Sequence, residues 1–535
     1  MSDNHEETLV LTSADQRVVD ERAVAAGVPS AVLMESAGRS AAEHIYRSCR
    51  WTKVVAVAGR GGNGGDALVV ARHLHQAGMD VSVFAVCAPE QFTDTTATMA
   101  RRLEQVAPGG LRFLTDDLAP LDEALGQADG VVDGLLGSGL DRPLSGRFSD
   151  VVAIINTAQT QTVSLDLPSG LPSDRGSPFD QAVQADLTIA MEFLKPAHLL
   201  YPARSHCGDI LLARVAYPQE VLAELVPLAR VIERAGARIR LPSRPPNGHK
   251  GTFGRVLVVA GSTGMSGAAI LCAKGALRAG AGLVTVACPS AINSVIETAL
   301  TEAISLPLPD KEGLLTPDAI GPLMSALDRA DVVAIGPGLS RQSSVGELVL
   351  ALLEKIRVPI VIDADGLFHL ADHLDRLKAF SGRVVLTPHP GELSHLIDQP
   401  ADRIDANRIE ATRRFATEHG VVLLLKGRPT AIGTPDGDLF LNSTGNTGLA
   451  TGGSGDALTG LIAGLLAGGA SPADAAILGA YLHGATADRL ARDIAERTIL
   501  PSDLIAGLPS VIAEVEAGSG GEQTPLADSD RKKEG

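Results

Sequence analysis

Chemistry is most readily predicted at residues 446–456, where four glycines precede a single aspartate. The stretch reads Asn-Thr-Gly-Leu-Ala-Thr-Gly-Gly-Ser-Gly-Asp and continues into an apolar run, 457–470, that predicts a buried helix. Glycines bring backbone N–H groups close to a ligand, and a helix N-terminus attracts anions through its unpaired N–H donors. Asp456 could hold a hydroxyl there while the backbone binds a phosphate. Aspartate is also a common N-cap, but the glycine density favours the anion site.

A second glycine-rich stretch, residues 59–66, lies between a predicted strand, 53–58, and a predicted helix, 67–77. This order of strand, loop and helix is typical of phosphate-binding units. The stretch contains the pattern G-x-G-x-x-G, which is weak evidence when it stands alone. Domains that transfer hydride also need an acid at the end of the second strand, and here Asp80 precedes that strand, 81–87. A hydride-transferring domain is therefore the less favoured interpretation.

Further acids follow the later strands of the first half. Asp133 comes after one apolar run and Asp166 after another. Because ligands of open α/β sheets bind at the carboxyl ends of the strands, we expect these acids to share one site with the glycine loop, although each alone could cap a loop. Oxygen ligands of this kind suit a hard cation. The residues expected to converge are Asn63, Asp66, Asp133, Asp166 and Ser169.

The second half also places polar residues at its predicted strand ends. His389 lies between two prolines, which favours a ligand contact over the structural role that most histidines have. Lys426 closes an apolar strand, where a buried ammonium group needs an anionic partner. Asp363 could equally cap a helix or organise a magnesium ion.

The composition limits the classes of protein to consider. A chain of 535 residues exceeds a single core, so two or more domains are expected. The formal charge of −17 argues against a nucleic-acid-binding surface, which needs clustered Lys and Arg. No apolar run could span a bilayer, the first residues lack a signal-peptide pattern, and the five cysteines form no C-x-x-C pair. We therefore expect a cytoplasmic protein with buried thiols and no membrane or nucleic-acid partner.

Both halves alternate strands with helices, which predicts two α/β domains with parallel sheets. The expected domains are residues 1–225 and 226–517. The Pro-rich segment 241–248 is interpreted as a connector. Residues 518–535 are polar and predicted to be disordered.

The first half resembles the NAD(P)H-hydrate epimerase domain over about residues 9–215. The likeness rests on Met-Glu-Ser-Ala-Gly at 34–38, Asn-Gly-Gly-Asp at 63–66, Asp133 with the Gly-Ser-Gly that follows it, and Leu-Asp-Leu-Pro-Ser-Gly at 165–170. It implies a Rossmann-like three-layer sandwich that binds the hydrated nicotinamide nucleotide and a potassium ion. The family usually has Asn where this chain has Gly62 and Gly where it has Ala67.

This resemblance also implies roles for individual residues. Asp166 is the candidate catalytic acid or base, and Lys195 would be catalytic too, or would instead form a salt bridge or extend to the surface as a snorkelled lysine. The potassium ligands would be Asn63, Asp133 and Ser169. The hydrate would be bound by Gly62, Asn63, Gly64, Gly65, Asp66, Gly137, Ser138, Gly139, Leu140, Asp141, Arg142, Pro143 and Asp166.

The second half resembles the ADP-dependent NAD(P)H-hydrate dehydratases of the ribokinase-like superfamily over about residues 245–515. Thr-Pro-His-Pro-Gly-Glu at 387–392 and Thr-Gly-Gly-Ser-Gly-Asp at 451–456 carry this likeness. It implies a ribokinase-like α/β domain in which Asp456 is a general base and Mg²⁺ assists. The hydrate would contact Ala269, Gly338, His389 and Asp456, and ADP would contact Lys426, Gly427, Arg428, Pro429, Thr430 and Gly455.

Together the two resemblances imply metabolite repair. The first domain would interconvert the R and S hydrates of NADH and NADPH, and the second would dehydrate the S form while ADP yields AMP and phosphate. The alternative is a ribokinase-like small-molecule kinase with a regulatory or nucleotide-sensing first domain. We also expect the chain to form a homo-oligomer.

Overall fold

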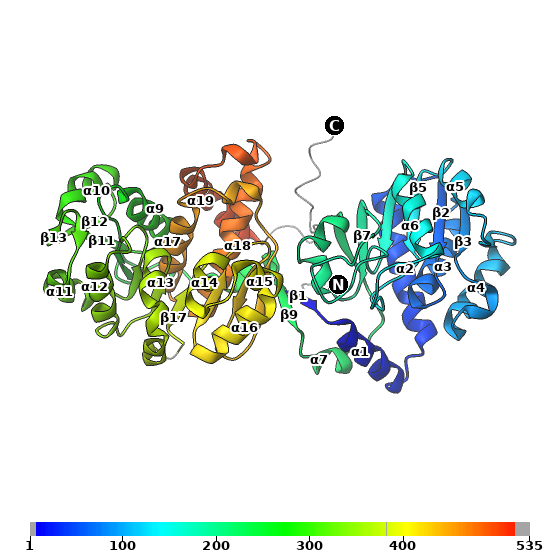
Figure 1. The fold of residues 1–535 in the computed structure, drawn as a ribbon, viewed down its shortest axis with the longest axis horizontal. Helices are drawn as coiled ribbons and strands as arrows, with labels where there is room; N and C mark the ends of the chain where they lie inside the picture. The colour runs from blue at the N-terminus through cyan, green and yellow to red at the C-terminus, as the bar shows by residue number, and fades with distance from the viewer. Residues whose placement is uncertain (1–6, 381, 519–535) are drawn as a thin grey trace. The chain divides into compact units, whose positions relative to one another are not determined.

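Residues 7–380 and 382–518 are described by the computed structural model of the protein. They divide into two compact units: an N-terminal unit of residues 8–228, and a C-terminal unit of residues 229–518 together with Glu7. In Figure 1 the colours run from blue to teal through the first unit and from green to red through the second.

Two segments discussed in the sequence analysis, 241–248 and 518–535, can be compared with this division of the chain. The Pro-rich segment 241–248, expected to be a connector, lies inside the C-terminal unit, because the chain passes between the units at Leu228 and Ala229. The predicted disordered tail, 518–535, lies outside the described residues except for Gly518.

A parallel seven-stranded sheet forms the centre of the N-terminal unit. Its order is β4-β3-β2-β5-β6-β7-β8, and all neighbouring strands are parallel, as predicted. Successive residues of β2 alternate between two cores: Ala56 packs into one and Val57 into the other. The strands are β2 (Lys53–Ala58), β3 (Asp80–Ala85), β4 (Leu111–Phe113), β5 (Gly130–Gly134), β6 (Gln161–Leu165), β7 (Leu187–Met191) and β8 (Asp209–Ala213).

Helices cover both faces of this sheet, which makes the N-terminal unit the expected three-layer sandwich. α2, α3 and α4 pack on the face of Ala56, and α5 and α6 pack on the face of Val57. The helices are α1 (Ser13–Ala25), α2 (Ser30–Ser48), α3 (Gly62–Gln76), α4 (Asp94–Val106), α5 (Ala119–Leu125), α6 (Arg147–Thr157) and α7 (Gln219–Ala223).

The helix after the first glycine loop begins at Gly62, earlier than the predicted start at residue 67. Gly62 to Gly65 therefore form its first turn, in which the N–H groups of Gly62, Asn63 and Gly64 have no acceptor within the helix, whereas that of Gly65 donates to the carbonyl oxygen of Gly61 at 3.1 Å. A Cβ added at Gly64 would lie only 1.9 Å from the carbonyl oxygen of Gly59. The absence of a side chain at this position lets α3 begin close to the end of β2.

The C-terminal unit is built on a larger sheet with the order β9-β20-β19-β18-β17-β16-β15-β10-β11-β12. Neighbouring strands are parallel from β18 to β12, as predicted, whereas β18, β19 and β20 are antiparallel because short loops join them. These strands are β9 (Ala229–Ile232), β10 (Arg255–Val259), β11 (Leu283–Pro289), β12 (Ile304–Leu308), β15 (Val332–Ile335), β16 (Ile360–Ile362), β17 (Val384–Leu386), β18 (Val422–Leu425), β19 (Thr430–Gly433) and β20 (Leu439–Asn442).

Helices α9, α17, α18 and α19 supply much of the core on one face of the larger sheet. Strand residues that point the other way, such as Leu257 and Ile335, are equally buried, so the second face is covered too. The helices are α8 (Arg234–Ile239), α9 (Ser266–Arg278), α10 (Asn293–Ala299), α11 (Ile320–Leu327), α12 (Ser343–Leu353), α13 (Ala364–Leu370), α14 (Pro390–Ile397), α15 (Ala401–Ala406), α16 (Arg408–His419), α17 (Ser454–Ala467), α18 (Pro472–Leu490) and α19 (Pro501–Ala517).

Two expectations from composition can be compared with the fold. All five cysteines are buried and form no disulfide, as predicted. Within residues 7–380 and 382–518, no helix is long and apolar enough to cross a membrane.

Candidate functional site

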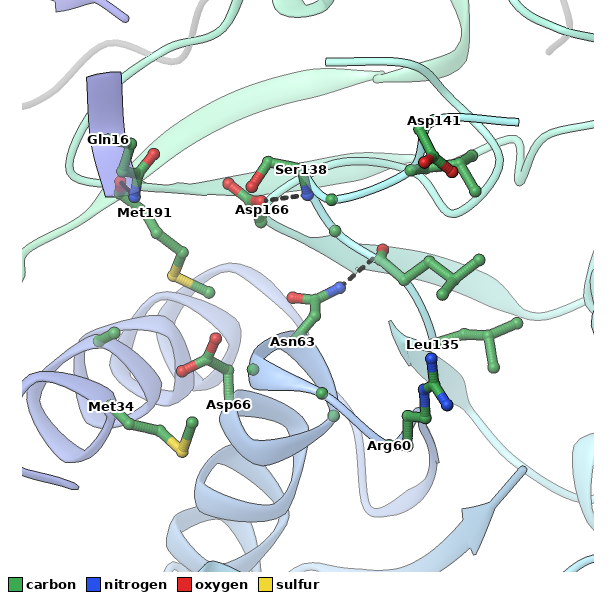
Figure 2. A pocket seen from close by; sticks show the side chains of 18 of the residues that line it. Gln16, Met34, Arg60, Asn63, Asp66, Leu135, Ser138, Asp141, Asp166 and Met191 are labelled. Atoms are coloured by element: carbon green, nitrogen blue, oxygen red, sulfur yellow. Dashed lines mark hydrogen bonds between the residues drawn. The ribbon is translucent and has the colours of Figure 1, made fainter. Parts of the chain in front are cut away.

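A cavity of about 870 Å³ lies in the N-terminal unit where β2, β5 and β6 end (Figure 2). The first turn of α3, the loop after β5 and Asp166 form much of its wall. Gly65 is the exception among the residues assigned to hydrate binding, because it packs against Met34 instead of lining the cavity. The assigned residues that do line it are Gly62, Asn63, Gly64, Asp66, Gly137, Ser138, Gly139, Leu140, Asp141, Arg142, Pro143 and Asp166.

Asp166 is held in this cavity by a buried cation. The fully buried Lys195 donates from Nζ to Asp166 Oδ1 at 3.0 Å, and the N–H of Ser138 donates to Asp166 Oδ2 at 2.9 Å. Burial disfavours the anion, but the Lys195 ammonium and the hydrogen bonds from Lys195 and Ser138 outweigh burial and lower the pKa of Asp166 below its usual value. Asp166 is therefore ionised at neutral pH. Lys195 forms the salt bridge and does not line the cavity, so any effect on a bound molecule passes through Asp166.

His198 fixes the backbone beneath Asp166. The N–H of Lys195 donates to His198 Nδ1 at 2.9 Å, so the ring proton lies on Nε2, which donates to the carbonyl oxygen of Asp166 at 2.7 Å. Burial and the Lys195 ammonium lower the pKa of His198 to about 3, which keeps the ring neutral. Asp166 has a φ of +59°, a left-handed conformation that side chains rarely adopt and that persists where the surroundings enforce it.

Asp66 faces the same cavity without a partner (Figure 2). Among the described residues, none donates a hydrogen bond to its carboxyl group or forms an ion pair with it. Burial, reinforced by the carboxyl groups of Asp166 and Asp20, raises the pKa of Asp66 well above its usual value. The cavity thus presents Asp166 with a lowered pKa and Asp66 with a raised pKa, and such a divergence of pKa values is typical of acid–base sites.

Of the expected potassium ligands, Asn63 lines the cavity, and Asp133 and Ser169 lie behind its wall. Ser164 Oγ and the N–H of Ser169 donate to Asp133 Oδ2 at 2.8 and 2.9 Å, and Ser169 Oγ lies 2.6 Å from Oδ1. Burial raises the pKa of Asp133, against the effect of these hydrogen bonds. Asn63 donates to the carbonyl oxygen of Leu136 at 2.8 Å, while its buried Oδ1 has no partner. Asn63 therefore offers the freest oxygen of the three.

The two departures from the family pattern fit the observed packing. Gly62 is exposed at the start of α3, where an added Cβ would meet nothing within 4 Å. Ala67 is fully buried, and its methyl group lies opposite Gly134 of β5, where a Cβ would come within 2.5 Å of it. Gly134 therefore makes room for the extra methyl group of Ala67.

The cavity also contains residues that the sequence did not indicate. Gln16 and Asp20 reach it from α1, Arg60 from the loop after β2, and Tyr217 from the segment after β8. Gln16 and Asp20 lie one helical turn apart and look like solvent-facing residues of α1 until the fold brings Tyr217 against them. No sequence pattern marked them as functional.

A second cavity, of about 360 Å³, lies within the C-terminal unit. It brings together residues from the end of β18, the loop after β20 and the first turn of α17. Pro429 is the one residue assigned to the adenine nucleotide that does not line it. The assigned residues that do are Lys426, Gly427, Arg428, Thr430 and Gly455.

Lys426 has the anionic partners that its position required. Its Nζ donates to Asp363 Oδ1 at 2.9 Å and lies 3.4 Å from Glu392 Oε2. Burial opposes the ammonium charge, but the two carboxylates outweigh burial and raise the pKa of Lys426. Asp363 is the N-cap residue of α13, but its side chain makes no capping hydrogen bond, because its carboxylate accepts from Lys426 and from Thr459 Oγ1 at 2.6 Å instead. Asp363 thus stands at the cap position that the sequence predicted, and its carboxylate serves the ion pair with Lys426.

Asp456 is the third residue of α17, which begins at Ser454 after Gly453 in a left-handed conformation (φ +94°). Its carboxyl group does not cap the helix, and among the described residues it has no hydrogen-bond partner. Burial, then the nearby Asp363, raises the pKa of Asp456 to about 6. A Cβ added at the adjacent Gly455 would lie 3.2 Å from Lys426 Nζ, so the ion pair and the helix N-terminus meet here.

None of the residues assigned to the hydrate, Asp456 included, lines the second cavity. His389 caps α14 by accepting the N–H groups of Gly391 and Glu392 at Nδ1, and more than half of its side chain is exposed. Gly338 lies beside Ala268, whereas the methyl group of Ala269 is buried in the core beside Gly261. The contacts of His389, Gly338 and Ala269 with a hydrate stay predictions.

Polar residues that the sequence did not assign complete the second cavity. His483 lies 3.3 Å from Ser454 Oγ, and burial lowers its pKa to about 4, so it is neutral. Asn446 accepts the N–H of Gly448 and donates to Asp488 at 3.1 Å, which shapes the loop before α17. Asn446 stands at the start of the glycine-rich stretch, but no signal in the sequence points to His483.

Two family models match this chain. Residues 256–510 match the model described as NAD(P)H-hydrate dehydratase. Residues 30–197 match the model described as YjeF-related protein N-terminus. The two matches fall one in each unit of the structure.

Two bacterial proteins are similar in sequence to this chain over most of its length. The bifunctional NAD(P)H-hydrate repair enzyme Nnr of Moorella thermoacetica is 42% identical over 495 residues, which cover 91% of this chain and 93% of the relative. The enzyme of the same name from Salinibacter ruber is 35% identical over 526 residues, covering 94% and 95%. Among solved structures, the ADP/ATP-dependent NAD(P)H-hydrate dehydratase from Bacillus subtilis, co-crystallized with ATP/Mg²⁺, is 34% identical with a TM-score of 0.46; the match covers 53% of this chain and 98% of that one.

Proposed function

The chain belongs to the family of bifunctional NAD(P)H-hydrate repair enzymes, and we propose that each of its units performs one step of that repair. The N-terminal unit interconverts the R and S epimers of hydrated NADH and NADPH. The C-terminal unit restores the reduced nucleotide from the S form, while ADP is converted to AMP and phosphate.

One observation carries this proposal. Each unit holds its own cavity, and each cavity gathers residues that the family resemblance had assigned to its ligand. The larger one, about 870 Å³, has room for a dinucleotide fragment, and the smaller one, about 360 Å³, lies at a helix N-terminus beside a paired lysine. A helix N-terminus with a nearby lysine suits the phosphates of an adenine nucleotide.

Asp456 is proposed as the general base of the dehydratase. It takes the proton of the ring hydroxyl, whose oxygen attacks the β-phosphorus of ADP, and AMP leaves. The phosphorylated oxygen then departs as phosphate, driven by the lone pair of the ring nitrogen, and loss of a ring proton restores NAD(P)H. A pKa of about 6 and the absence of a hydrogen-bond partner suit a base that works near neutral pH.

Backbone N–H groups at the start of α17 would stabilise the transferring phosphoryl group. Lys426, held by Asp363 and Glu392, would neutralise charge on the nucleotide. Within residues 7–380 and 382–518, no group of three or more His, Cys, Asp or Glu side chains is arranged to hold a metal ion. A Mg²⁺ ion would therefore bind mainly through the phosphates, with Asp363 as the protein carboxylate, and would reduce the phosphate charge.

Asp166 is proposed as the base of the epimerase, with Asp66 as the acid. Lys195 keeps Asp166 ionised, so it can take a proton from the ring hydroxyl or from water, while the raised pKa of Asp66 suits a group that donates one. The unpaired Oδ1 of Asn63 suits a potassium ligand, and Asp133 and Ser169 would complete that site. A K⁺ ion there would hold the loop after β5 and supply positive charge near the bound nucleotide.

A single incubation tests both steps. Mixed epimers of NADH hydrate are incubated with excess ADP, and the absorbance of the reduced nicotinamide is followed to completion. Full conversion is expected. Conversion that stops at the S fraction would refute the epimerase assignment, and a stable phosphorylated product without reduced nicotinamide would favour the small-molecule kinase.

The proposal also covers the domain boundaries, the cellular location and the oligomeric state of the protein. The functional domains would span residues 1–225 and 226–517. The protein would act in the cytoplasm as a homo-oligomer. Light scattering of the purified protein measures the oligomeric state directly, and a monomer would contradict the proposal.

A further inference from the structure

The cavity of the N-terminal unit has two chemically different ends. In Figure 2, Arg60 and Asp141 lie toward one end, and Gln16 lies with Met191 at the other. Asp66 and Asp166 stand between the two ends. The end with Arg60 also carries the glycine turns, whose backbone N–H groups suit phosphate. The opposite end must then receive the part of the ligand that is farthest from the phosphates.

The end with Gln16 offers a carboxylate oxygen with no donor. Gln16 and Asp20 are one turn apart on α1, so they share a face of the helix, and both line the cavity. Tyr217 Oη donates to Asp20 Oδ1 at 2.5 Å. Burial and the Asp20 carboxyl raise the pKa of Tyr217, so the hydroxyl stays a donor. Among the described residues, none donates to the other oxygen, Asp20 Oδ2.

Gln16 leaves a second acceptor unused. Its Nε2 donates to the carbonyl oxygen of Met191 at 3.4 Å, which turns its Oε1 away from that partner. This Oε1 is buried and has no hydrogen-bond partner. A buried acceptor without a donor is unfavourable, and a ligand that brings N–H groups would relieve it after a small rotation of the amide.

We propose that Gln16 and Asp20, positioned by Tyr217, form a binding site for the primary amide of the nicotinamide ring. The NH₂ group has two donors, and the two residues offer two acceptors. This inference rests on the proposed epimerase function, because it takes the hydrate as the ligand of this cavity.

The order of groups along the substrate matches the order of residues along the cavity. The carbon that carries the ring hydroxyl is next to the ring nitrogen and the ribose, and the amide is attached on the opposite side of the ring. When that carbon lies between Asp66 and Asp166 with the phosphates near Arg60, the amide points to the end of the cavity formed by α1.

A purely structural role for the same residues is the competing explanation. Tyr217 belongs to a small core with Val19 and Phe193, and its ring stacks on Phe193 at 5.7 Å between centroids. Its bond to Asp20 could serve only to hold α1 in place. The two explanations predict different substrate preferences. If the hydrogen bond between Tyr217 and Asp20 only stabilises the fold, its loss should change the rate with every substrate by the same factor.

The test compares two substrates on the full-length enzyme without ADP. One is NADH hydrate, and the other is the hydrate of the analogue in which an acetyl group replaces the carboxamide, so that it has no N–H donor. Epimer exchange is measured as kcat/KM and divided by the uncatalysed rate of each substrate. The variants are Asp20→Ala, Tyr217→Phe and Gln16→Leu. Glu21→Ala, an exposed neighbour on α1, is the control.

The wild type should prefer the amide by about 10- to 100-fold, as expected for a hydrogen bond to a charged group. Asp20→Ala should abolish the preference by slowing only the amide substrate, Tyr217→Phe and Gln16→Leu should reduce it, and Glu21→Ala should keep it. Equal rates of wild type on both substrates, or equal slowing of both by Asp20→Ala, would overturn the amide site and leave the epimerase in place. A wild type that exchanges neither hydrate would refute the proposed function itself. If Asp20→Ala does not fold, the substrate preference of the wild type and of Gln16→Leu still tests whether this is an amide site.

Discussion

Replacement of Lys195 by methionine should destabilise the N-terminal unit strongly and in a pH-dependent way. Methionine keeps most of the volume and removes the charge. Lys195 is completely buried, and the Asp166 side chain is only 10% exposed, so the variant leaves a carboxylate buried without its cation. Breaking a buried pair by removing one partner costs about 3–5 kcal/mol. The N–H of Ser138 still donates to Asp166, which favours the lower part of this range.

The pH dependence follows from the sign of the pKa shift. In the wild type the pKa of Asp166 is lowered, so its pairing stabilises the fold above the ordinary aspartate pKa of about 3.9 and is lost as the pH falls through the folded value. In the variant, burial without Lys195 raises the pKa of Asp166, and the carboxyl takes up a proton at a higher pH. The difference in unfolding free energy is therefore largest at neutral pH and shrinks as the solution is acidified.

Trp51 provides the assay. It is the only tryptophan in the chain, it is 7% exposed in the N-terminal unit, and its indole donates to Gln161 at 3.0 Å. Its fluorescence during urea denaturation therefore reports on this unit. Lys53→Met is the matched control, because Lys53 is half-buried and bonds to the neutral Gln127; its effect should stay within about 0.5 kcal/mol.

Two results would refute this reasoning. A loss below about 1 kcal/mol at neutral pH would mean that the ion pair contributes no more than a surface pair. A loss of the same size at neutral and acidic pH would mean that packing, and not the unpaired charge, causes it. Adding Asp166→Asn to Lys195→Met should recover part of the lost stability, since no charge then remains without a partner.

Three further predictions concern activity. Asp456→Asn should lower dehydratase turnover by about 10²–10⁴-fold while calorimetry still detects nucleotide binding; near-wild-type turnover would remove Asp456 as the base. Wild-type dehydratase turnover should rise as the pH increases through about 6, because Asp456 acts as a base only when it is deprotonated. A kcat that is the same below and above this pH would contradict the prediction. Asn63→Ala should abolish the stimulation of epimer exchange by KCl over tetramethylammonium chloride and leave dehydratase activity unchanged; retained stimulation would place K⁺ elsewhere.

The sequence predicted the layers of the fold because its strands are continuous apolar runs followed by glycine-rich turns. It misplaced the start of α3, since a run of glycines between residues 59 and 66 looks unfavourable for a helix. Packing decides the matter here: Gly64 faces the carbonyl oxygen of Gly59, and the helix begins where that contact allows. For Asp456 the sequence left a cap and an anion site open, and the start of α17 at Ser454 excludes the cap.

Other parts of the candidate sites could not be predicted because they depend on contacts between distant segments. Tyr217 and Asp20 are 197 residues apart in the chain, and only the folded unit shows that their side chains meet. Lys426 needed an anionic partner on physical grounds, but nothing in the sequence identified Asp363 and Glu392 as the partners. The identity of the ligands came from the family resemblance and not from the physical pattern.

The pairing of Ala67 with Gly134 has a consequence for how this glycine turn can vary. The gap between α3 and β5 holds one methyl group, and in this chain the helix supplies it. A Cβ at Gly134 would also come within 2.8 Å of the carbonyl oxygen of Asn63, so the strand cannot take this methyl group even if the helix position became glycine. The two positions therefore differ in tolerance: Ala67 could become glycine without a clash, whereas any side chain at Gly134 should push the glycine turn away from the sheet.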